Sequence, residues 1–252
     1  MKLLIDIGNT NTSLAVVKGG KVRKRYFIRT ARKQVEQKSL RRLFGPVLSM
    51  IEEVVIVSVV PKFLPIIKRN IRAVVPDVPV YVVGRDIKVP MRIRYKKPGE
   101  VGQDRLVTSF SAYRLFGSQV LVVDFGTAVT FDLVNNKGDY EGGLIFPGLR
   151  LGLESLVRNT ALLPRVRIRS TKGLIGRDTR SSMNKGIILG YAALCDGIIR
   201  MFREKYGKKL KVIATGGDAG LIKKYSSQIK AVYPDLLFEG LYLLSESGSK
   251  KN

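Results

Sequence analysis

Residues 3–12 read LLIDIGNTNT, and residues 121–130 read LVVDFGTAVT. Aligned without a gap, the two segments place Asp6 with Asp124, Gly8 with Gly126, and Thr12 with Thr130. Each segment starts with an apolar run of strand length and passes through small and hydroxyl residues into a second apolar run. This pattern predicts a β-hairpin whose tight turn carries the polar groups. Because it occurs twice, it also indicates a duplicated architecture.

The residue types of both turns suit phosphate and cation binding. Gly8 and Gly126 have no Cβ atom, so backbone N–H groups beside them can approach a ligand closely. Neighbouring Asn and Thr side chains can donate to phosphate oxygens, and hard cations prefer carboxylate ligands such as Asp6 and Asp124. A D-x-G segment can equally be an ordinary hairpin turn whose Asp bonds its own backbone. The repetition with matching flanks favours the phosphate-binding interpretation.

The composition limits the class of protein. A chain of 252 residues can form two modest domains or one large one, and a hydrophobic fraction of 45% is typical of globular proteins. Its apolar runs are shorter than the roughly 18 residues that span a bilayer. The N-terminus leads straight into Asp6, unlike a signal peptide. We therefore expect a cytoplasmic protein without a membrane partner.

The sequence has no histidine and a single cysteine, Cys195. Ser-His-Asp catalysis, Cys-His catalysis, histidine-ligated zinc and an intramolecular disulfide are therefore excluded. Small and apolar neighbours predict that Cys195 is a buried helix residue. Any general base must be Asp, Glu, Lys or Tyr, among which carboxylates are the natural candidates.

The formal net charge is +25, from 45 Lys and Arg against 20 Asp and Glu. Such an excess attracts anions, including nucleotides, acidic metabolites and nucleic acid. The basic residues are spread along the chain and form no polybasic tail, which favours a solvated surface. Nucleic acid is kept as the less favoured partner.

Periodicity and turn residues predict alternating strands and helices. In the first half we expect strands at 13–17, 22–28, 54–60 and 81–83, and helices at 32–44 and 63–75. A further helix opens at Gly102-Gln103-Asp104-Arg105, with Asp104 at or near its N-cap. Asp104 could simply cap this helix, or the helix start together with Arg105 could bind an anion.

The second half repeats this plan. We expect strands on both sides of the Asp124 turn, a third at 140–145, helices at 149–157 and 182–202, and a loop at 160–178. A strand at 211–215 leads into Gly216-Gly217-Asp218, which could accept a nucleotide or form a plain turn. We expect two domains, residues 1–115 and 116–252.

An Asp-bearing hairpin in each half, followed by a Gly-Gly turn, resembles the actin, hexokinase and acetate kinase superfamily. Within it, the ordered motifs are similar to those of type III pantothenate kinases: residues 6–10 (DIGNT), 102–105 (GQDR), 124–128 (DFGTA), 142–148 (GGLIFPG), 160–164 (TALLP) and 215–218 (TGGD). The likeness extends from Leu3 to about Gly240. It implies an α/β fold of two duplicated RNase H-like (actin-like ATPase) domains, each a mixed five-stranded sheet with helices.

The resemblance implies that the γ-phosphoryl group of ATP is transferred to pantothenate, giving 4'-phosphopantothenate in the first step of coenzyme A biosynthesis. It implies Asp104 as the catalytic base, Asp6 as a Mg²⁺ ligand and Asp124 as the ligand of a monovalent cation, K⁺ or NH₄⁺. The implied ATP and phosphate contacts are Asp6, Ile7, Gly8, Asn9, Thr10, Asn11, Thr12, Ser13 and Thr127. The implied pantothenate contacts are Tyr95, Gly102, Gln103, Asp104, Arg105 and Thr179. A homodimer is implied as well.

The chain departs from the family pattern at two positions. Val101 stands where Leu is common, which is a conservative change, and Ser13 stands where a basic residue commonly ends the phosphate segment. The second difference predicts weaker ATP binding. The alternative function is a kinase-fold regulatory protein that binds nucleic acid through its basic surface. Asp6, Asp104 and Asp124 favour the enzyme, since a pure binding protein needs none of them.

Overall fold

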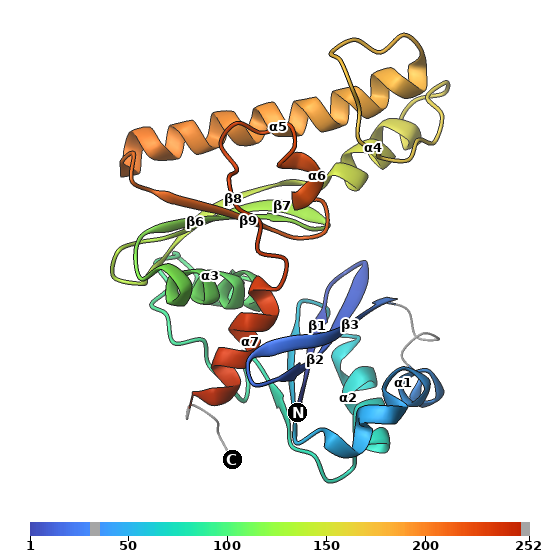
Figure 1. The fold of residues 1–252 in the computed structure, drawn as a ribbon, viewed down its shortest axis with the longest axis vertical. Helices are drawn as coiled ribbons and strands as arrows, with labels where there is room; N and C mark the ends of the chain where they lie inside the picture. The colour runs from blue at the N-terminus through green and yellow to red at the C-terminus, as the bar shows by residue number, and fades with distance from the viewer. Residues whose placement is uncertain (31–35, 248–252) are drawn as a thin grey trace. The chain divides into compact units, whose positions relative to one another are not determined.

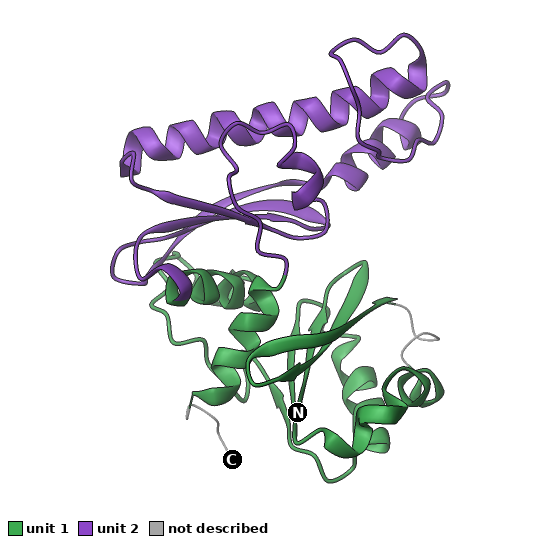
Figure 2. Cartoon of the chain, in the orientation of Figure 1, with its two compact units in different colours: residues 1–114, 235–252 green, residues 115–234 purple. Residues whose placement is uncertain are grey.

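The computed structural model describes residues 1–30 and 36–247. Two units divide the chain, as the colours of Figure 2 show: unit 1 contains residues 1–114 and the chain from Asp235 onward, and unit 2 contains residues 115–234. The first boundary lies one residue from the expected one. The expected second range, 116–252, differs at its C-terminal end, because the last helix packs into the core of unit 1.

Unit 1 is built on a mixed five-stranded sheet (Figure 1) with the order β3-β2-β1-β4-β5. The strands are β1 (Lys2–Ile7), β2 (Asn11–Lys18), β3 (Lys21–Arg29), β4 (Glu53–Ser58) and β5 (Val80–Val82). The first three strands form an antiparallel meander, whereas β4 and β5 run parallel to β1. The β-branched run at the start of β4 is fully buried, as expected for a central strand with both faces covered.

Helices cover both faces of this sheet. On one face, the alternate residues Leu3, Ile5 and Ile7 pack with α1 (Gln37–Phe44) and α2 (Leu64–Val74). On the other face, Leu4 packs with α3 (Gln103–Phe116) and α7 (Leu236–Glu246). Short 3₁₀ helices, η2 (Gly45–Met50) and η3 (Pro98–Glu100), lie in the connections. The helix expected at 32–44 is observed over 37–44, and residues 32–35 lie outside the described residues.

Unit 2 has a four-stranded sheet with the order β8-β7-β6-β9. Its strands are β6 (Val120–Phe125), β7 (Ala128–Val134), β8 (Tyr140–Pro147) and β9 (Lys211–Thr215), and its helices are α4 (Leu149–Arg158), α5 (Thr179–Tyr206) and α6 (Ala219–Ile222). The expectation of five strands in each domain is therefore corrected for unit 2. A single parallel bridge between Ala214 and Val232 lies where β5 lies in unit 1, and the backbone there does not continue into a strand.

The core of unit 2 lies between its sheet and α5, the long helix at the top of Figure 1. Residues Leu121, Val123 and Phe125 of β6 face this core. Cys195 is fully buried on α5, as predicted, and burial raises the pKa of its thiol to about 12. This thiol is a core group, because the reactive form of cysteine is the thiolate.

The two sheets share one plan, in which β1, β2, β3 and β4 correspond to β6, β7, β8 and β9. The hairpin turns differ in length: the first turn comprises residues 8–10, and the second turn comprises residues 126–127. Asp6 therefore pairs with Ser13 across the first hairpin, and Asp124 pairs with Thr130 across the second. The structural equivalent of Thr130 is thus Ser13, and the gapless alignment of Thr12 with Thr130 was wrong by one residue.

Candidate active site

Asp6 lies near the end of β1, one residue before the last strand residue. Side chains alternate along a strand, so Asp6 and Leu4 point to the sheet face that α3 and α7 cover. In the first turn that follows, the N–H of Gly8 donates to the carbonyl oxygen of Asn11 at 3.1 Å. A half-buried carboxylate beside a turn with exposed backbone is an arrangement that can hold a hydrated cation against phosphate.

The predicted phosphate segment divides into exposed and buried residues. Asn9, Thr10 and Asn11 are exposed. Ile7 and Thr12 have no exposed surface, and the Thr12 hydroxyl lies 3.1 Å from the Thr30 hydroxyl. Ile7 and Thr12 are therefore closed to a ligand in this conformation, whereas Asn9, Thr10 and Asn11 are accessible.

Asp104 lies in the first turn of α3, which begins at Gln103. Its Oδ1 atom accepts a hydrogen bond from the N–H of Arg105 at 2.8 Å, and its carbonyl oxygen accepts one from the Thr108 hydroxyl, also at 2.8 Å. Asp104 thus shares features of both interpretations left open by the sequence. Its carboxylate satisfies a backbone donor of the helix start, and a negative charge is stabilised at this end of a helix.

Glycines bring the start of α3 to the edge of the sheet. Gly84, just after β5, has φ of +86°, and a Cβ atom there would lie 2.8 Å from Cδ of Gln103. Val59, just after β4, donates its N–H to Ile7 at 3.1 Å, and its Cγ1 atom would lie 3.7 Å from a Cβ atom on Gly102. The carboxyl ends of β1, β4 and β5 therefore meet the start of α3.

Two consequences follow for the predicted residues of unit 1. Asp6 lies near the carboxyl end of β1, and Asp104 lies at the start of α3, which meets the same edge of the sheet. Tyr95 and Arg105 are half-buried; Tyr95 lies in the connection between β5 and α3, and Arg105 follows Asp104 on the helix.

In unit 2, Asp124 lies near the end of β6, where the N–H of Gly126 donates to the carbonyl oxygen of Ala128 at 3.0 Å. Gly216 follows β9 and has φ of +90°. A Cβ atom on Gly216 would overlap Oδ1 of Asp124 and would lie 2.6 Å from the backbone N and C atoms of Phe125. Only glycine fits here, so the Gly216-Gly217 turn packs directly against the Asp124 carboxylate.

The second turn is also held by the start of α4. Gly148, the N-cap residue of α4, donates its N–H to the carbonyl oxygen of Thr127 at 2.9 Å. Arg150, in the first turn of α4, lies 3.7 Å from the Asp218 carboxylate. A helix start that carries an arginine and contacts Thr127 through Gly148 can attract an anion. Arg150 is not among the residues predicted from the sequence, although its position after Pro147-Gly148 at a helix start indicates an anion-binding place.

Thr179 is the first residue of α5 and is exposed. The helix was expected to begin at Ser182 but starts three residues earlier, because Asp178 and Ser181 form a capping box. The hydrogen bonds from the backbone N–H and hydroxyl of Ser181 hold the pKa of Asp178 below its usual value. Thr179 is therefore fixed at a capped helix start and not in a loop.

The carboxylates at the two turns can bind cations for which water and phosphate oxygens supply most of the ligands. No group of three or more Asp, Glu, His or Cys side chains able to hold a metal occurs among residues 1–30 and 36–247. The Asp6 carboxylate in unit 1 suits Mg²⁺ in this respect, because Mg²⁺ is usually bound by one or two carboxylates with waters and substrate phosphates.

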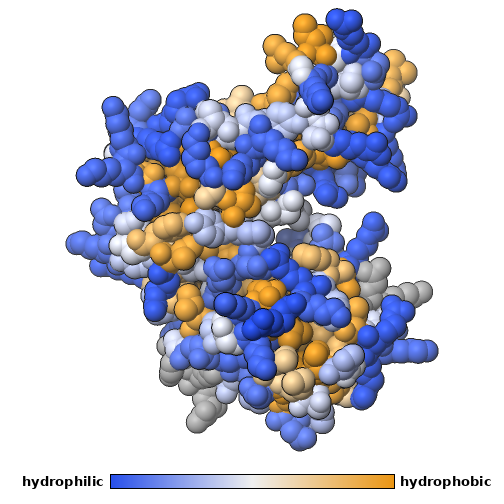
Figure 3. All heavy atoms as spheres, viewed as in Figure 1, coloured by the Kyte–Doolittle hydropathy of each residue, from blue (hydrophilic) through white to orange (hydrophobic). Residues whose placement is uncertain are grey.

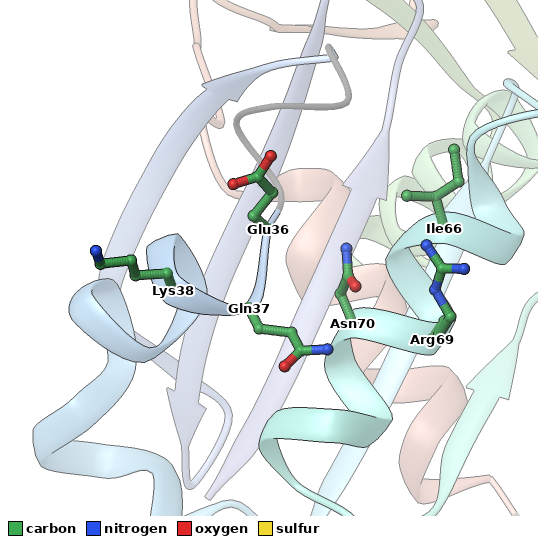
Figure 4. Close-up of a pocket in the computed structure, with 6 residues that line it drawn as sticks. All are labelled: Glu36, Gln37, Lys38, Ile66, Arg69 and Asn70. Carbon is green, nitrogen blue, oxygen red and sulfur yellow. The ribbon is translucent and has the colours of Figure 1, made fainter.

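A separate hollow of about 680 Å³ opens between α1 and α2 (Figure 4). Its lining includes Glu36, Gln37, Lys38, Ile66, Arg69 and Asn70. The side chains drawn in Figure 4 come from the start of α1 and from α2. None of these six belongs to the predicted site.

The fold is that of the two-domain actin-like kinases, with a β-hairpin and an Asp at the corresponding place in each sheet. The model of the type III pantothenate kinase family matches residues 2–201, so the chain belongs to that family and is a kinase. ATP is the co-substrate that the family implies, together with a small-molecule acceptor and typically a divalent metal. In the described part of the chain, no helix is both long and apolar enough to cross a membrane.

Solved structures agree on the fold at low sequence identity. A conserved Campylobacter jejuni protein, provisionally assigned as a Baf family transcriptional activator, has a TM-score of 0.59 and 17% identity, with 96% of each chain covered. A Sinorhizobium meliloti protein provisionally assigned as a 2-dehydro-3-deoxygalactonokinase has a TM-score of 0.57 and 14% identity, covering 97% of this chain and 98% of its own. The ethanolamine utilization protein EutJ from Carboxydothermus hydrogenoformans reaches 0.55 at 12% identity, covering 96% and 89%.

Proposed function

We propose that the protein phosphorylates pantothenate with ATP, giving 4'-phosphopantothenate in the first step of coenzyme A biosynthesis. The family match over residues 2–201 carries this proposal. The position of Asp104 supports it, since a carboxylate at a helix start on the same sheet edge as the first turn can act on an acceptor hydroxyl. In a chain without histidine, a carboxylate is the natural general base.

In this mechanism Asp104 accepts the proton of the primary hydroxyl of pantothenate, and the hydroxyl oxygen attacks the γ-phosphorus of ATP. The bond from this phosphorus to the oxygen that bridges the β- and γ-phosphates breaks, and ADP leaves. Phosphoryl transfer depends mainly on positioning and charge neutralisation. Backbone N–H groups of the first turn and the Asn9, Thr10 and Asn11 side chains would hold phosphate oxygens. Thr127 of the second turn would contact ATP as well. Ser13 would contribute a hydroxyl at the position where relatives commonly have a basic residue.

Pantothenate carries a carboxylate group, so a positively charged side chain is expected in its binding pocket. Arg105, beside Asp104 on α3, suits this role because guanidinium binds carboxylates with two parallel hydrogen bonds. Gly102 and Gln103 would line the same part of the pocket with Tyr95. Thr179 is retained as a further pantothenate contact from the family resemblance.

Two cations complete the proposal. Asp6 would hold Mg²⁺, which neutralises charge on the ATP phosphates, and Asp124 would hold K⁺ or NH₄⁺. The close approach of Gly216 to Asp124 supports the second assignment, because this contact fixes the carboxylate against the backbone. Among the residues described, neither place gathers three or more acidic, histidine or cysteine side chains, so each cation would draw further ligands from backbone, water and phosphate.

We also propose a homodimer in the cytoplasm. Unit 2 exposes several large apolar side chains around α4 and the 160–178 connection, visible as orange spheres in the upper part of Figure 3. Leu162, Leu174 and Ile175 are 91%, 78% and 76% exposed. Large apolar side chains exposed close together in the chain can form part of an interaction site.

The test is ADP release by the purified protein with pantothenate, ATP and Mg²⁺, in the presence of K⁺ or of Na⁺. The proposal expects turnover that requires pantothenate and is faster with K⁺. ADP release with another alcohol and none with pantothenate would refute the acceptor assignment. Tight, salt-sensitive DNA binding without ADP release would instead favour the regulatory alternative, because phosphate contacts make affinity depend strongly on salt.

A further inference from the structure

Thr30 makes three hydrogen bonds to the first hairpin. It follows β3, and its N–H donates to the carbonyl oxygen of Thr10 at 3.0 Å. Its hydroxyl donates to the carbonyl oxygen of Gly8 at 2.7 Å and lies 3.1 Å from the hydroxyl of Thr12. Both ends of the first turn are thus bonded to one residue.

The backbone part of this contact occurs in both units. In unit 2, Gly148 follows β8 and donates its N–H to Thr127, the last residue of the second turn, at 2.9 Å. The strand registers make the two positions equivalent, since Arg29 pairs with Asn11 and Pro147 pairs with Ala128. A residue placed directly after the third strand therefore fixes the turn in each copy of the repeat.

The side-chain part differs between the copies. A Cβ atom on Gly148 would overlap the carbonyl oxygen of Thr127 and would lie 2.6 Å from that of Gly126, so the second turn excludes any side chain. At the equivalent position of unit 1, Thr30 fits, and its hydroxyl bonds the Gly8 carbonyl. The three-residue first turn thus gains a restraint that the two-residue second turn lacks.

From these contacts we infer that Thr30 is a positioning residue that fixes the backbone of residues 8–10 in the conformation that binds the phosphates of ATP. This inference rests on the proposed function and deepens it by naming what shapes the phosphate site. Thr30 acts through the carbonyl groups of Gly8 and Thr10, whose adjoining N–H groups are then held in fixed directions. A loop fixed before binding loses less conformational entropy when the nucleotide arrives.

The test compares Thr30→Val, which keeps the shape and the N–H but loses the hydroxyl, with Thr30→Ser, which keeps the hydroxyl. Thr30→Val removes both hydrogen bonds of the hydroxyl, and we expect it to weaken MgADP binding, measured by titration calorimetry, roughly tenfold, in line with a modest net contribution from each bond. KM for ATP should rise similarly while KM for pantothenate stays within about twofold. In Thr30→Ser, the MgADP affinity and the KM for ATP should be close to those of the unmodified protein.

Ser247→Ala serves as the matched control, because the Ser247 hydroxyl also donates to a backbone carbonyl, that of Leu244, at 2.8 Å but at the end of α7. Unchanged MgADP affinity in Thr30→Val, or an equal rise in both KM values, would overturn the inference. A nucleotide effect with rescue by Thr30→Ser, in a protein that does not phosphorylate pantothenate, would support the Thr30 assignment and refute only the acceptor. Absence of nucleotide binding by the unmodified protein would overturn both.

Discussion

A Cβ atom on Gly102 would lie 2.5 Å from Oδ1 of Asp104, the atom that accepts the N–H of Arg105. Gly102 precedes α3, so the absence of a side chain there allows the Asp104 carboxylate to fold back over the helix start. The relationship links a glycine of the 102–105 motif to the proposed base. It suggests that Gly102 acts mainly by leaving space for Asp104.

The first prediction concerns this contact. Gly102→Ala should displace the Asp104 carboxylate and lower kcat by at least about tenfold, because a base that moves by an ångström loses its alignment with the hydroxyl. Unfolding temperature should change little, since Gly102 does not have a positive φ. The matched control is Gly99→Ala, where a Cβ atom would meet nothing within 4 Å. Equal kcat values for the two variants would contradict the explanation.

The second prediction concerns Gly216 in unit 2. Gly216→Ala forces a side chain into a left-handed conformation and against Phe125, which should lower stability by more than about 1–2 kcal/mol. It should also weaken activation by K⁺, because the new methyl group would displace Asp124. Thermal unfolding and the K⁺ concentration for half-maximal activity are the measurements.

Gly217 is an internal control for this experiment. It is adjacent to Gly216, its φ is not positive, and a Cβ atom there would meet nothing within 4 Å. Gly217→Ala should therefore leave both the unfolding temperature and the K⁺ response nearly unchanged. Equal effects at the two glycines would count against a specific contact with Asp124.

The third prediction concerns pH and stability. Asp196 on α5 is buried, which alone would raise its pKa, but hydrogen bonds from Ser226, Ser227 and Gln228 outweigh burial and hold the pKa below its usual value. A depressed folded-state pKa stabilises the protein above the unfolded-state pKa of about 3.9, and this stabilisation is lost as pH falls through the lower folded value.

Asp196→Asn should therefore lower the unfolding temperature at pH 7, with a loss of about 1–3 kcal/mol in the free energy of unfolding. Below pH 4 the difference in unfolding temperature between the variant and the unmodified protein should become smaller. Thermal unfolding between pH 3 and pH 7 measures this. Glu154→Gln, which removes an exposed ion pair with Arg158 at 3.6 Å, should leave the pH profile unchanged. A constant gap at all pH values would refute the assignment.

The fourth prediction concerns the proposed dimer. Replacing Leu174 and Ile175 together by serine should shift the protein toward monomer in sedimentation experiments, because their exposed apolar surface would no longer favour association. The double variant should keep its circular dichroism spectrum, since neither residue belongs to a core of the described structure. A monomeric unmodified protein would contradict the homodimer outright.

Much of this fold could be predicted from local sequence patterns. Apolar runs ending in an Asp and a glycine gave both hairpins, and the β-branched run of residues 54–57 gave the central strand. Such features succeed because a strand buried on both faces and a tight turn each impose a residue pattern over a few positions. The helix predicted at 182–202 from helical periodicity is observed as α5 (Thr179–Tyr206), which is longer at both ends.

Other features depend on distant parts of the chain. No element was expected at 236–246, where α7 is apolar around most of its circumference and carries Gly240. A Cβ atom on Gly240 would lie 2.6 Å from the carbonyl oxygen of Val107 on α3, so this glycine is explained by a partner more than a hundred residues away. The role of Thr30 and the extra residue of the first turn likewise emerge only from strand register.

The measurement that tests the central claim most directly is ADP release with pantothenate, ATP, Mg²⁺ and K⁺ by the unmodified protein and by Asp104→Asn. We predict turnover by the unmodified protein and a loss of about 10²–10⁴-fold in kcat for the variant, with its unfolding temperature retained. Full activity of Asp104→Asn would contradict the assignment of the base, and absence of pantothenate-dependent ADP release by the unmodified protein would contradict the proposed function.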